Sequence, residues 1–219
     1  ARGKVCKQSL SLYAHPRKTG IKAIKIAEGD TLVDVKLTNG QSEIILATRK
    51  GMAIRFHETT VRPMGRDTAG VCGITLRGND EVIGLETPRP GATLLTVCEN
   101  GYGKRSAIED YRLTNRGGVG VINIKTTERN GLVVAVKEVI DDDELIVMTR
   151  QGVAIRVHVS DIRVISRNTQ GVRIINLEAG DVVTGVARLA EKDDAEAEEG
   201  EQTSEADSSA ADDSGDSEQ

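Results

Sequence analysis

Lysine and arginine side chains recur along most of the chain at an interval of about 50 residues. One group lies beside a repeated glycine, and a second group of arginines stands four residues before another repeated glycine. Cations that return once per structural unit can meet phosphate groups at regular intervals without reading bases. The predicted phosphate-binding track consists of Lys4, Arg49, Lys50, Arg55, Arg66, Lys104, Arg105, Arg116, Arg150, Arg156 and Arg167.

Catalytic chemistry has little support in the residue pattern. His15, His57 and His158 stand alone, without a repeated serine, cysteine or carboxylate partner, so no catalytic triad is predicted. The pair Gly103-Lys104 lacks the other residues of a phosphate-binding loop. We therefore expect no catalytic residue and no bound cofactor in this chain.

Metal and disulfide sites are not predicted either. Cys6, Cys72 and Cys98 are widely spaced, with no Cys-x-x-Cys pair, which is typical of reduced packing thiols. The acidic run at residues 141–144 lies between two apolar segments, and this position indicates a solvated hairpin tip rather than a metal site.

Two glycine motifs define four sequence repeats. One glycine opens a short apolar segment, at Gly3, Gly51, Gly101 and Gly152. The other begins a Gly-Val/Ile-x-x-Ile pattern, at Gly20, Gly70, Gly120 and Gly171. Because both motifs keep nearly the same spacing through four copies, we divide the chain into units of about 1–48, 49–98, 99–149 and 150–190.

Each unit holds about four short segments in which apolar residues alternate with polar or small ones. In the second unit these are Met52–Phe56, Val71–Leu76, Glu81–Leu85 and Thr93–Val97. Turn-forming residues separate them, and helical spacing is nearly absent. A small sheet of this size buries its faces only by stacking on its neighbours. The predicted fold is therefore all-β, with propeller-like, four-stranded blades.

The net charge of −5 conceals two regions of opposite sign. Residues 191–219 carry 13 acidic side chains, one lysine and no Val, Ile, Leu or aromatic residue, which predicts a disordered acidic tail. Residues 1–190 carry 28 basic and 21 acidic side chains, and this excess favours a polyanionic partner. No apolar run is long enough for a membrane helix, so no membrane contact is predicted.

The repeat is incomplete at its ends. The last unit contains only three of the four segments, and the chain starts at Ala1, without Met, where a preceding fourth segment is expected to finish. We expect the chain to be a fragment whose parent carries further blades upstream.

Several multi-residue motifs resemble the C-terminal domain of the bacterial DNA gyrase A protein. They are residues 70–74 (GVCGI), 100–105 (NGYGKR), 127–133 (TERNGLV) and 167–172 (RNTQGV). The resemblance covers residues 1 to about 190 and extends to the acidic tail that commonly follows. It implies a β-pinwheel of six blades that exchange strands with their neighbours, of which this chain has the last four.

That resemblance also implies a function. The family wraps double-stranded DNA around a basic rim with positive handedness, which directs strand passage toward negative supercoiling. The implied partners are DNA, the gyrase B protein and the gyrase A dimer, in an A2B2 complex that uses ATP and Mg²⁺ elsewhere. The implied location is the cytoplasm, on the bacterial chromosome.

One family motif is altered in this chain. The wrapping signature Gln-Arg-Arg-Gly-Gly-x-Gly belongs to the first blade, and its degenerate echo here retains Arg116, Gly117, Gly118 and Gly120. Two alternatives remain open: the related C-terminal domain of topoisomerase IV, and a protein-binding propeller of the chromatin-condensation-regulator type. The recurring arginines argue against the protein-binding propeller, and the motifs together with the acidic tail favour gyrase.

Overall fold

Thirteen short β-strands build the part of the chain that the computed structural model describes, residues 1–189. The strands are β1 (Lys4–Val5), β2 (Glu43–Thr48), β3 (Met52–His57), β4 (Val71–Cys72), β5 (Val82–Glu86), β6 (Thr93–Cys98), β7 (Tyr102–Ala107), β8 (Val121–Ile122), β9 (Val133–Val139), β10 (Glu144–Thr149), β11 (Ala154–His158), β12 (Val172–Arg173) and β13 (Val183–Leu189). Four 3₁₀ turns accompany them: η1 (Leu10–Tyr13), η2 (Glu58–Thr60), η3 (Ile108–Asp110) and η4 (Val159–Asp161). In this part of the chain no helix is long and apolar enough to span a membrane.

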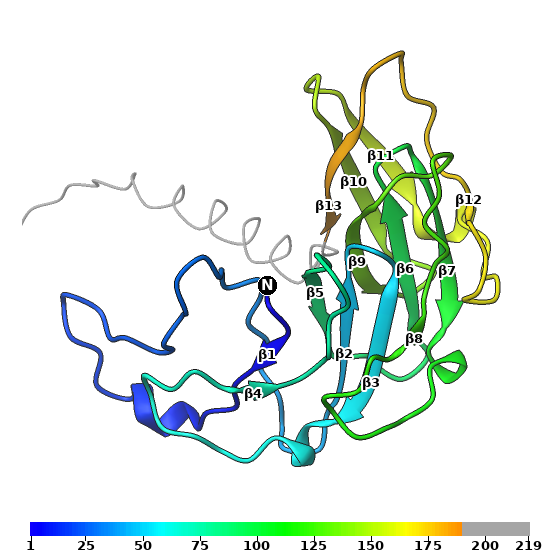
Figure 1. Ribbon diagram of the computed structural model, residues 1–219. Coiled ribbons are helices and arrows are strands. Elements are labelled where there is room, and N and C mark those ends of the chain that lie inside the picture. The colour runs from blue at the N-terminus through cyan, green and yellow to red at the C-terminus, as the bar shows by residue number, and fades with distance from the viewer. Residues whose placement is uncertain (190–219) are drawn as a thin grey trace, which may run out of the picture. The chain divides into compact units, whose positions relative to one another are not determined.

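These strands form four antiparallel sheets (Figure 1). The first sheet pairs β1 with β4, and the second has the order β5-β2-β3-β8. The third sheet has the order β9-β6-β7-β12, and the fourth has the order β13-β10-β11. The structure thus confirms the predicted all-β class and the four-stranded blade.

Each four-stranded sheet has strands from three sequence units: its central strand β2 or β6 ends the preceding unit, and its short Gly-Val strand comes from the following unit. The short Gly-Val strands β4, β8 and β12 pair with β1, β3 and β7 of the preceding unit. The exchanged strand is an outer edge of its sheet, whereas β5, β9 and β13 form the opposite edge and pack against one another. Neighbouring units are therefore linked by backbone hydrogen bonds as well as by packing.

The exchanged strands are shorter than predicted. The sequence indicated a strand over 71–76, but β4 ends at Cys72 because the backbone then turns inward. The amides of Gly73 and Ile74 share the carbonyl oxygen of Gly3, at 2.8 and 3.2 Å, and the Ile74 side chain enters the core with 2% exposure. A bifurcated bond of this kind ends the ladder and anchors the strand.

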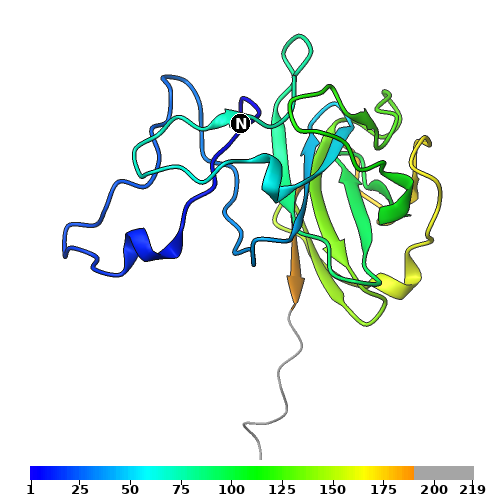
Figure 2. The same cartoon turned by 90° about the horizontal axis from the view of Figure 1, so that it is seen from below.

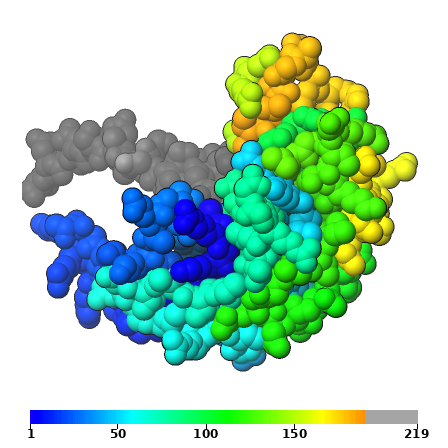
Figure 3. Space-filling model, viewed as in Figure 1, coloured from blue at the N-terminus to red at the C-terminus, as the bar shows by residue number. Residues whose placement is uncertain are grey.

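Alternating side chains of each central strand serve two cores. In β2, Ile45 and Ala47 pack in a cluster with Leu94 of the third sheet, whereas Ile44 and Leu46 pack in a cluster that Val5 of the first sheet adjoins. Because successive strand residues face opposite sides, a sheet between two neighbours is buried on both faces. Figure 2 and the space-filling view in Figure 3 show the described segments following one another in chain order.

The repeated glycine before β3 and β7 allows the backbone of the exchanged segment to approach closely. Gly101 has φ +76°, and a Cβ atom there would lie 2.7 Å from the carbonyl oxygen of Ile175. Its counterpart Gly152 has φ +86° but no atom within 4 Å of the same position, because no described strand pairs with the outer edge of β11. The predicted acidic tail, 191–219, lies outside the described residues.

Candidate nucleic-acid interface

Four of the predicted track residues are exposed cations that make no ion pair within residues 1–189. Lys4 lies on β1, Lys50 and Arg150 lie at hairpin turns, and Arg66 lies in the loop before β4. Lys50 donates a hydrogen bond to the side-chain oxygen of Asn79 and otherwise faces solvent. These four side chains remain available to a partner that carries phosphate groups.

Lys104 and Arg105 are not on the surface, and their predicted place on the track is corrected. Lys104 is 0% and Arg105 4% exposed, because the segment after η4 of the next unit lies over β7. The Lys104 ammonium donates to Ser106 Oγ at 2.5 Å and to the Ser166 carbonyl at 3.3 Å. Arg105 Nε donates to the carbonyl of Ile162 at 2.7 Å. Both side chains hold the next unit in place.

Burial lowers the pKa of Lys104 to about 7, from an ordinary value of 10.5. Between pH 7 and pH 10.5 Lys104 binds a proton in the unfolded chain but not in the folded chain. The contribution of Lys104 to the free energy of unfolding therefore rises with pH in this range, and it is lowest below about pH 7. Lys104→Met should therefore raise the free energy of unfolding at pH 6, by up to about 4 kcal/mol, and by much less at pH 9. Urea unfolding of both proteins at the two pH values checks this, and a gain independent of pH would contradict it.

Three more track residues are held by carboxylates. Arg55 Nε donates to Glu43 at 2.7 Å, and its Nη1 donates to the carbonyls of Ile108 and Tyr111 at 2.9 and 3.1 Å. Arg156 is the counterpart of Arg55 in the fourth unit, and it pairs with Glu144 while staying exposed. Arg49 likewise bridges two carboxylates, Glu81 at 3.0 Å and Glu99 at 3.1 Å, and these hydrogen bonds raise its pKa.

The arginines that precede the exchanged strands hold backbone carbonyls. Arg116 donates to the carbonyls of Thr60 and Cys72, at 2.9 and 2.8 Å. Arg167 repeats the arrangement one unit later, at the carbonyls of Asp110 and Ile122, 3.1 and 2.8 Å away. A guanidinium has five donors in a fixed fork, so each arginine joins a 3₁₀ turn to an exchanged strand.

Arg116 belongs to the degenerate wrapping signature, whose glycines follow it directly. Gly117 has φ +84° and donates its amide to the carbonyl of Gly73 at 2.6 Å. Gly118 and Gly120 lead into β8, and the Thr75 amide binds the Gly118 carbonyl at 2.8 Å. In this chain the motif fastens the third unit to the second.

A further set of recurring arginines was not among the predicted track residues. Arg62, Arg112 and Arg163 are all exposed, and none makes an ion pair within the described residues. They follow the opening glycine of their units by the same number of residues, so the repeat itself carried the signal.

The fold gives these three arginines equivalent positions. Each directly follows the buried residue that caps the C-terminal end of a 3₁₀ turn: Val61 is 4%, Tyr111 0% and Ile162 3% exposed. Two residues beyond each arginine, a backbone amide donates to a carbonyl of the preceding unit: Met64 to Lys7 at 2.8 Å, Thr114 to Arg55 at 2.9 Å and Ile165 to Arg105 at 2.9 Å. The backbone thus presents one exposed arginine in each of the last three units.

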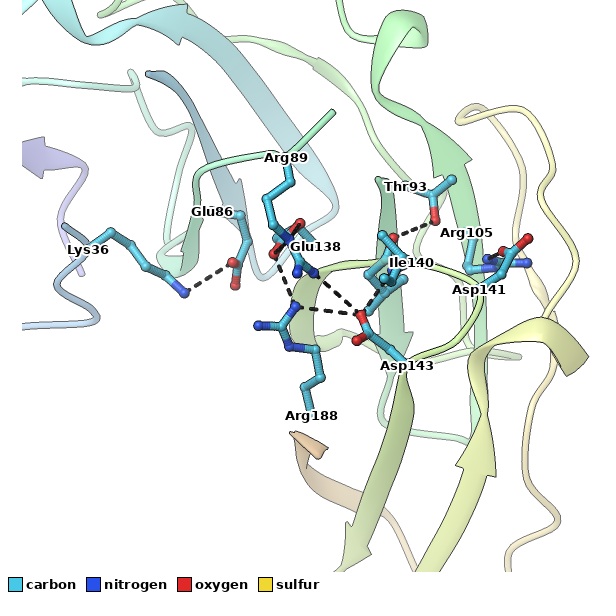
Figure 4. Close-up of polar contacts among 11 residues, drawn as sticks. Lys36, Glu86, Arg89, Thr93, Arg105, Glu138, Ile140, Asp141, Asp143 and Arg188 are labelled. Atoms are coloured by element: carbon cyan, nitrogen blue, oxygen red, sulfur yellow. Dashed lines mark hydrogen bonds and ion pairs between the residues drawn. The ribbon is translucent and has the colours of Figure 1, made fainter. Parts of the chain in front are cut away.

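Charged side chains near the C-terminal ends of the edge strands β5 and β9 form ion pairs with one another and with neighbouring segments (Figure 4). Glu86, 2% exposed, lies 3.1 Å from Lys36 and 3.4 Å from Lys137. Glu138, at the corresponding end of β9, pairs with Arg89 at 2.8 Å and with Arg188 at 3.2 Å. These cations neutralise buried carboxylates between neighbouring sheets, so they are poorly placed to bind the phosphate groups of a partner as well.

Metal-ligating side chains do not gather in the part of the chain that the structure describes. No group of three His, Cys, Asp or Glu residues there could hold a metal ion. The three cysteines are free, and burial raises the pKa of Cys98 to about 12. The recurring exposed arginines are therefore the feature most suited to binding chemistry.

Comparison with known proteins places this architecture in a family. The model of the DNA gyrase C-terminal domain, a β-propeller, matches residues 1–39, 42–88, 92–139 and 143–190. The DNA gyrase A protein of Chlamydia pneumoniae is 44% identical over 197 residues, which are 88% of this chain and 24% of the relative. The DNA gyrase A protein of Staphylococcus aureus is 44% identical over 204 residues, which are 92% of this chain and 23% of the relative. The chain thus spans about a quarter of these proteins.

Solved structures agree on the fold. The C-terminal domain of DNA gyrase A aligns with a TM-score of 0.78 at 26% identity, covering 87% of this chain and 64% of that one. The C-terminal domain of DNA topoisomerase IV aligns with a TM-score of 0.81 at 25% identity, covering 86% of this chain and 59% of that one. Backbone similarity does not separate the two, but the family model and the sequence relatives do, and the chain belongs to the DNA gyrase C-terminal domain family of β-propellers.

Proposed function

We propose that this chain binds duplex DNA along the outer edges of its sheets and bends it, as the DNA-wrapping module of a type II topoisomerase. The observation that carries the proposal is the exposed arginine at the same position of the last three units, Arg62, Arg112 and Arg163. Arg66 and Lys4 add exposed charge near the exchanged strands. Phosphates of a curved duplex meet such cations in turn, with no base contact needed.

The parent enzyme is proposed to be a gyrase, since the sequence relatives are gyrase A proteins. In it, wrapping with positive handedness presents a DNA segment for strand passage and so favours negative supercoiling. ATP and Mg²⁺ serve parts of the complex outside this chain, and the gyrase B protein and a second gyrase A chain are the proposed partners. The proposed location is the cytoplasm, on the bacterial chromosome.

Ligation of a nicked plasmid in the presence of the chain tests the bending. If the chain wraps DNA with positive handedness, closing the nick and removing the protein should leave plasmid with a raised linking number, and the shift should grow with protein concentration. Gel electrophoresis with an intercalator gives its sign. An unchanged linking number at a concentration that saturates binding would contradict wrapping.

A further inference from the structure

Two exposed arginines meet at one aromatic ring on the third sheet. The guanidinium carbon of Arg129 lies 4.7 Å from the centroid of the Tyr102 ring, and that of Arg173 lies 5.4 Å from it. Arg173 Nη2 also donates to the Tyr102 hydroxyl at 2.9 Å, and Nη1 donates to Asn176 at 3.2 Å. Tyr102 itself is 8% exposed, so its ring is a fixed platform.

Neither guanidinium has a carboxylate partner within residues 1–189. Arg49, Arg55 and Arg89 each pair with at least one Glu in that region, but no ion pair involves Arg129 or Arg173. The neighbouring Glu128 is exposed and pairs with neither. Two like charges on one ring repel each other unless an anion lies between them, so the arrangement favours binding of an anion.

The backbone around this pair is held in place. Arg173 is on the exchanged strand β12, directly opposite Tyr102 of β7. Arg129 lies in a turn that the buried Asn130 fixes: its Nδ2 donates to the carbonyls of Lys125 and Gln170 at 2.9 and 3.0 Å, and its Oδ1 accepts from the Thr127 amide at 2.7 Å. The two cations are therefore preorganised at the outer edge of the third sheet.

We propose that Arg129 and Arg173, supported by Tyr102, clamp one phosphodiester group of the bound duplex. A guanidinium fork matches phosphate oxygens in two parallel hydrogen bonds, and both forks are exposed at the edge where the duplex is proposed to pass. The clamp rests on the proposed DNA-binding function and adds a fixed point of contact to it. The second sheet lacks it, since the positions of Tyr102 and Arg173 hold Met52 and Ile122 there.

The second sheet supplies the replacement for a test. Tyr102→Met with Arg129→Asn and Arg173→Ile copies the residues Met52, Asn79 and Ile122. We expect this variant to bind duplex DNA roughly tenfold more weakly at about 0.1 M salt, with a slope of log K against log[salt] reduced by about 1–2. A control variant, Arg17→Ala with Arg77→Ala, removes two exposed arginines that rest on no aromatic ring. An equal loss in the two variants would overturn the clamp and leave the DNA-binding function standing.

The single variant Tyr102→Met keeps both arginines but removes the ring that holds them in place, so it tests the contribution of the ring apart from that of the charges. It should weaken binding severalfold, and unchanged affinity in a protein with an unchanged circular dichroism spectrum would overturn the role of the ring.

The tyrosine provides a readout that does not depend on DNA affinity. The two arginines lower the pKa of Tyr102 through their hydrogen bonds to it, so an anion that neutralises them should raise that pKa again. Absorbance at 295 nm in a Tyr13→Phe background follows the titration, since burial raises the pKa of Tyr111 above the range scanned. We expect an upward shift with a short duplex.

Inorganic phosphate is the second probe, because a free phosphate ion shares the chemistry of the phosphodiester. A shift with phosphate and none with DNA would overturn the duplex clamp in favour of a free-anion site. No shift with either probe would overturn the clamp entirely. If the wild-type chain does not bind DNA at all, the proposed function fails, and the phosphate titration alone then decides whether the anion site exists.

Discussion

Replacing Arg62, Arg112 and Arg163 together by alanine should weaken binding to duplex DNA by about 10²–10³-fold at about 0.1 M salt. The slope of log K against log[salt] should become shallower by about 3, because each neutralised phosphate contributes about −0.9. The three side chains are exposed and pair with no carboxylate in the described part of the chain, so their loss removes phosphate contacts without exposing a buried charge. Fluorescence anisotropy with a labelled duplex long enough to pass three sheets measures both quantities.

The matched control replaces the same three arginines by lysine. Charge is kept, so the slope should stay close to that of the wild-type chain, with a smaller loss of affinity from the missing guanidinium fork. Thermal unfolding should be nearly the same in all three proteins. If the triple alanine variant bound DNA as tightly as the wild type, these arginines would not be part of the DNA interface.

Gly101→Ala should destabilise the protein by about 3–5 kcal/mol, far more than Gly152→Ala at the equivalent position. Both glycines have a positive φ, +76° and +86°, so both variants incur the strain of a left-handed conformation, about 1 kcal/mol. Only at Gly101 would the new methyl group meet backbone, the Ile175 carbonyl oxygen at 2.7 Å. The difference between the two variants therefore measures how tightly the exchanged strand β12 lies against β7.

Urea unfolding followed by circular dichroism gives both free energies. The Gly101 variant should also lose the cross-strand contact between Arg173 and Tyr102, which the tyrosine absorbance reports. Equal destabilisation of the two variants would mean that the exchanged strand moves away at little cost, contrary to the close packing of β12 against β7 at Gly101.

The repeat made much of this fold predictable. A short apolar and β-branched run between turn residues, such as Thr93–Val97, indicates a strand locally, and the glycine spacing gives the number of units. The exchange of β8 into the second sheet was implied by the family resemblance and not by the pattern itself. Ala53 and Val121 are paired although they lie far apart in the sequence. The repeat period and the strand propensity of each residue do not determine which distant strands pair.

The site was less predictable than the fold, because burial of a cation depends on what lies over it. Arg105 and Arg156 occupy equivalent positions, yet the first is 4% exposed and the second is exposed, since only Arg105 is covered by the turn of a following unit. Likewise, Arg116 has its donors engaged by carbonyls from distant segments. Sequence spacing finds recurring arginines, but it does not tell which of them hold the blades together.

The salt dependence of DNA affinity tests the central claim most directly. If exposed cations on successive sheets neutralise roughly 6–8 phosphates, log K of the wild-type chain for duplex DNA should fall linearly with log[salt], with a slope of about −5 to −7. An affinity that stays flat as salt is raised would contradict a phosphate-binding rim.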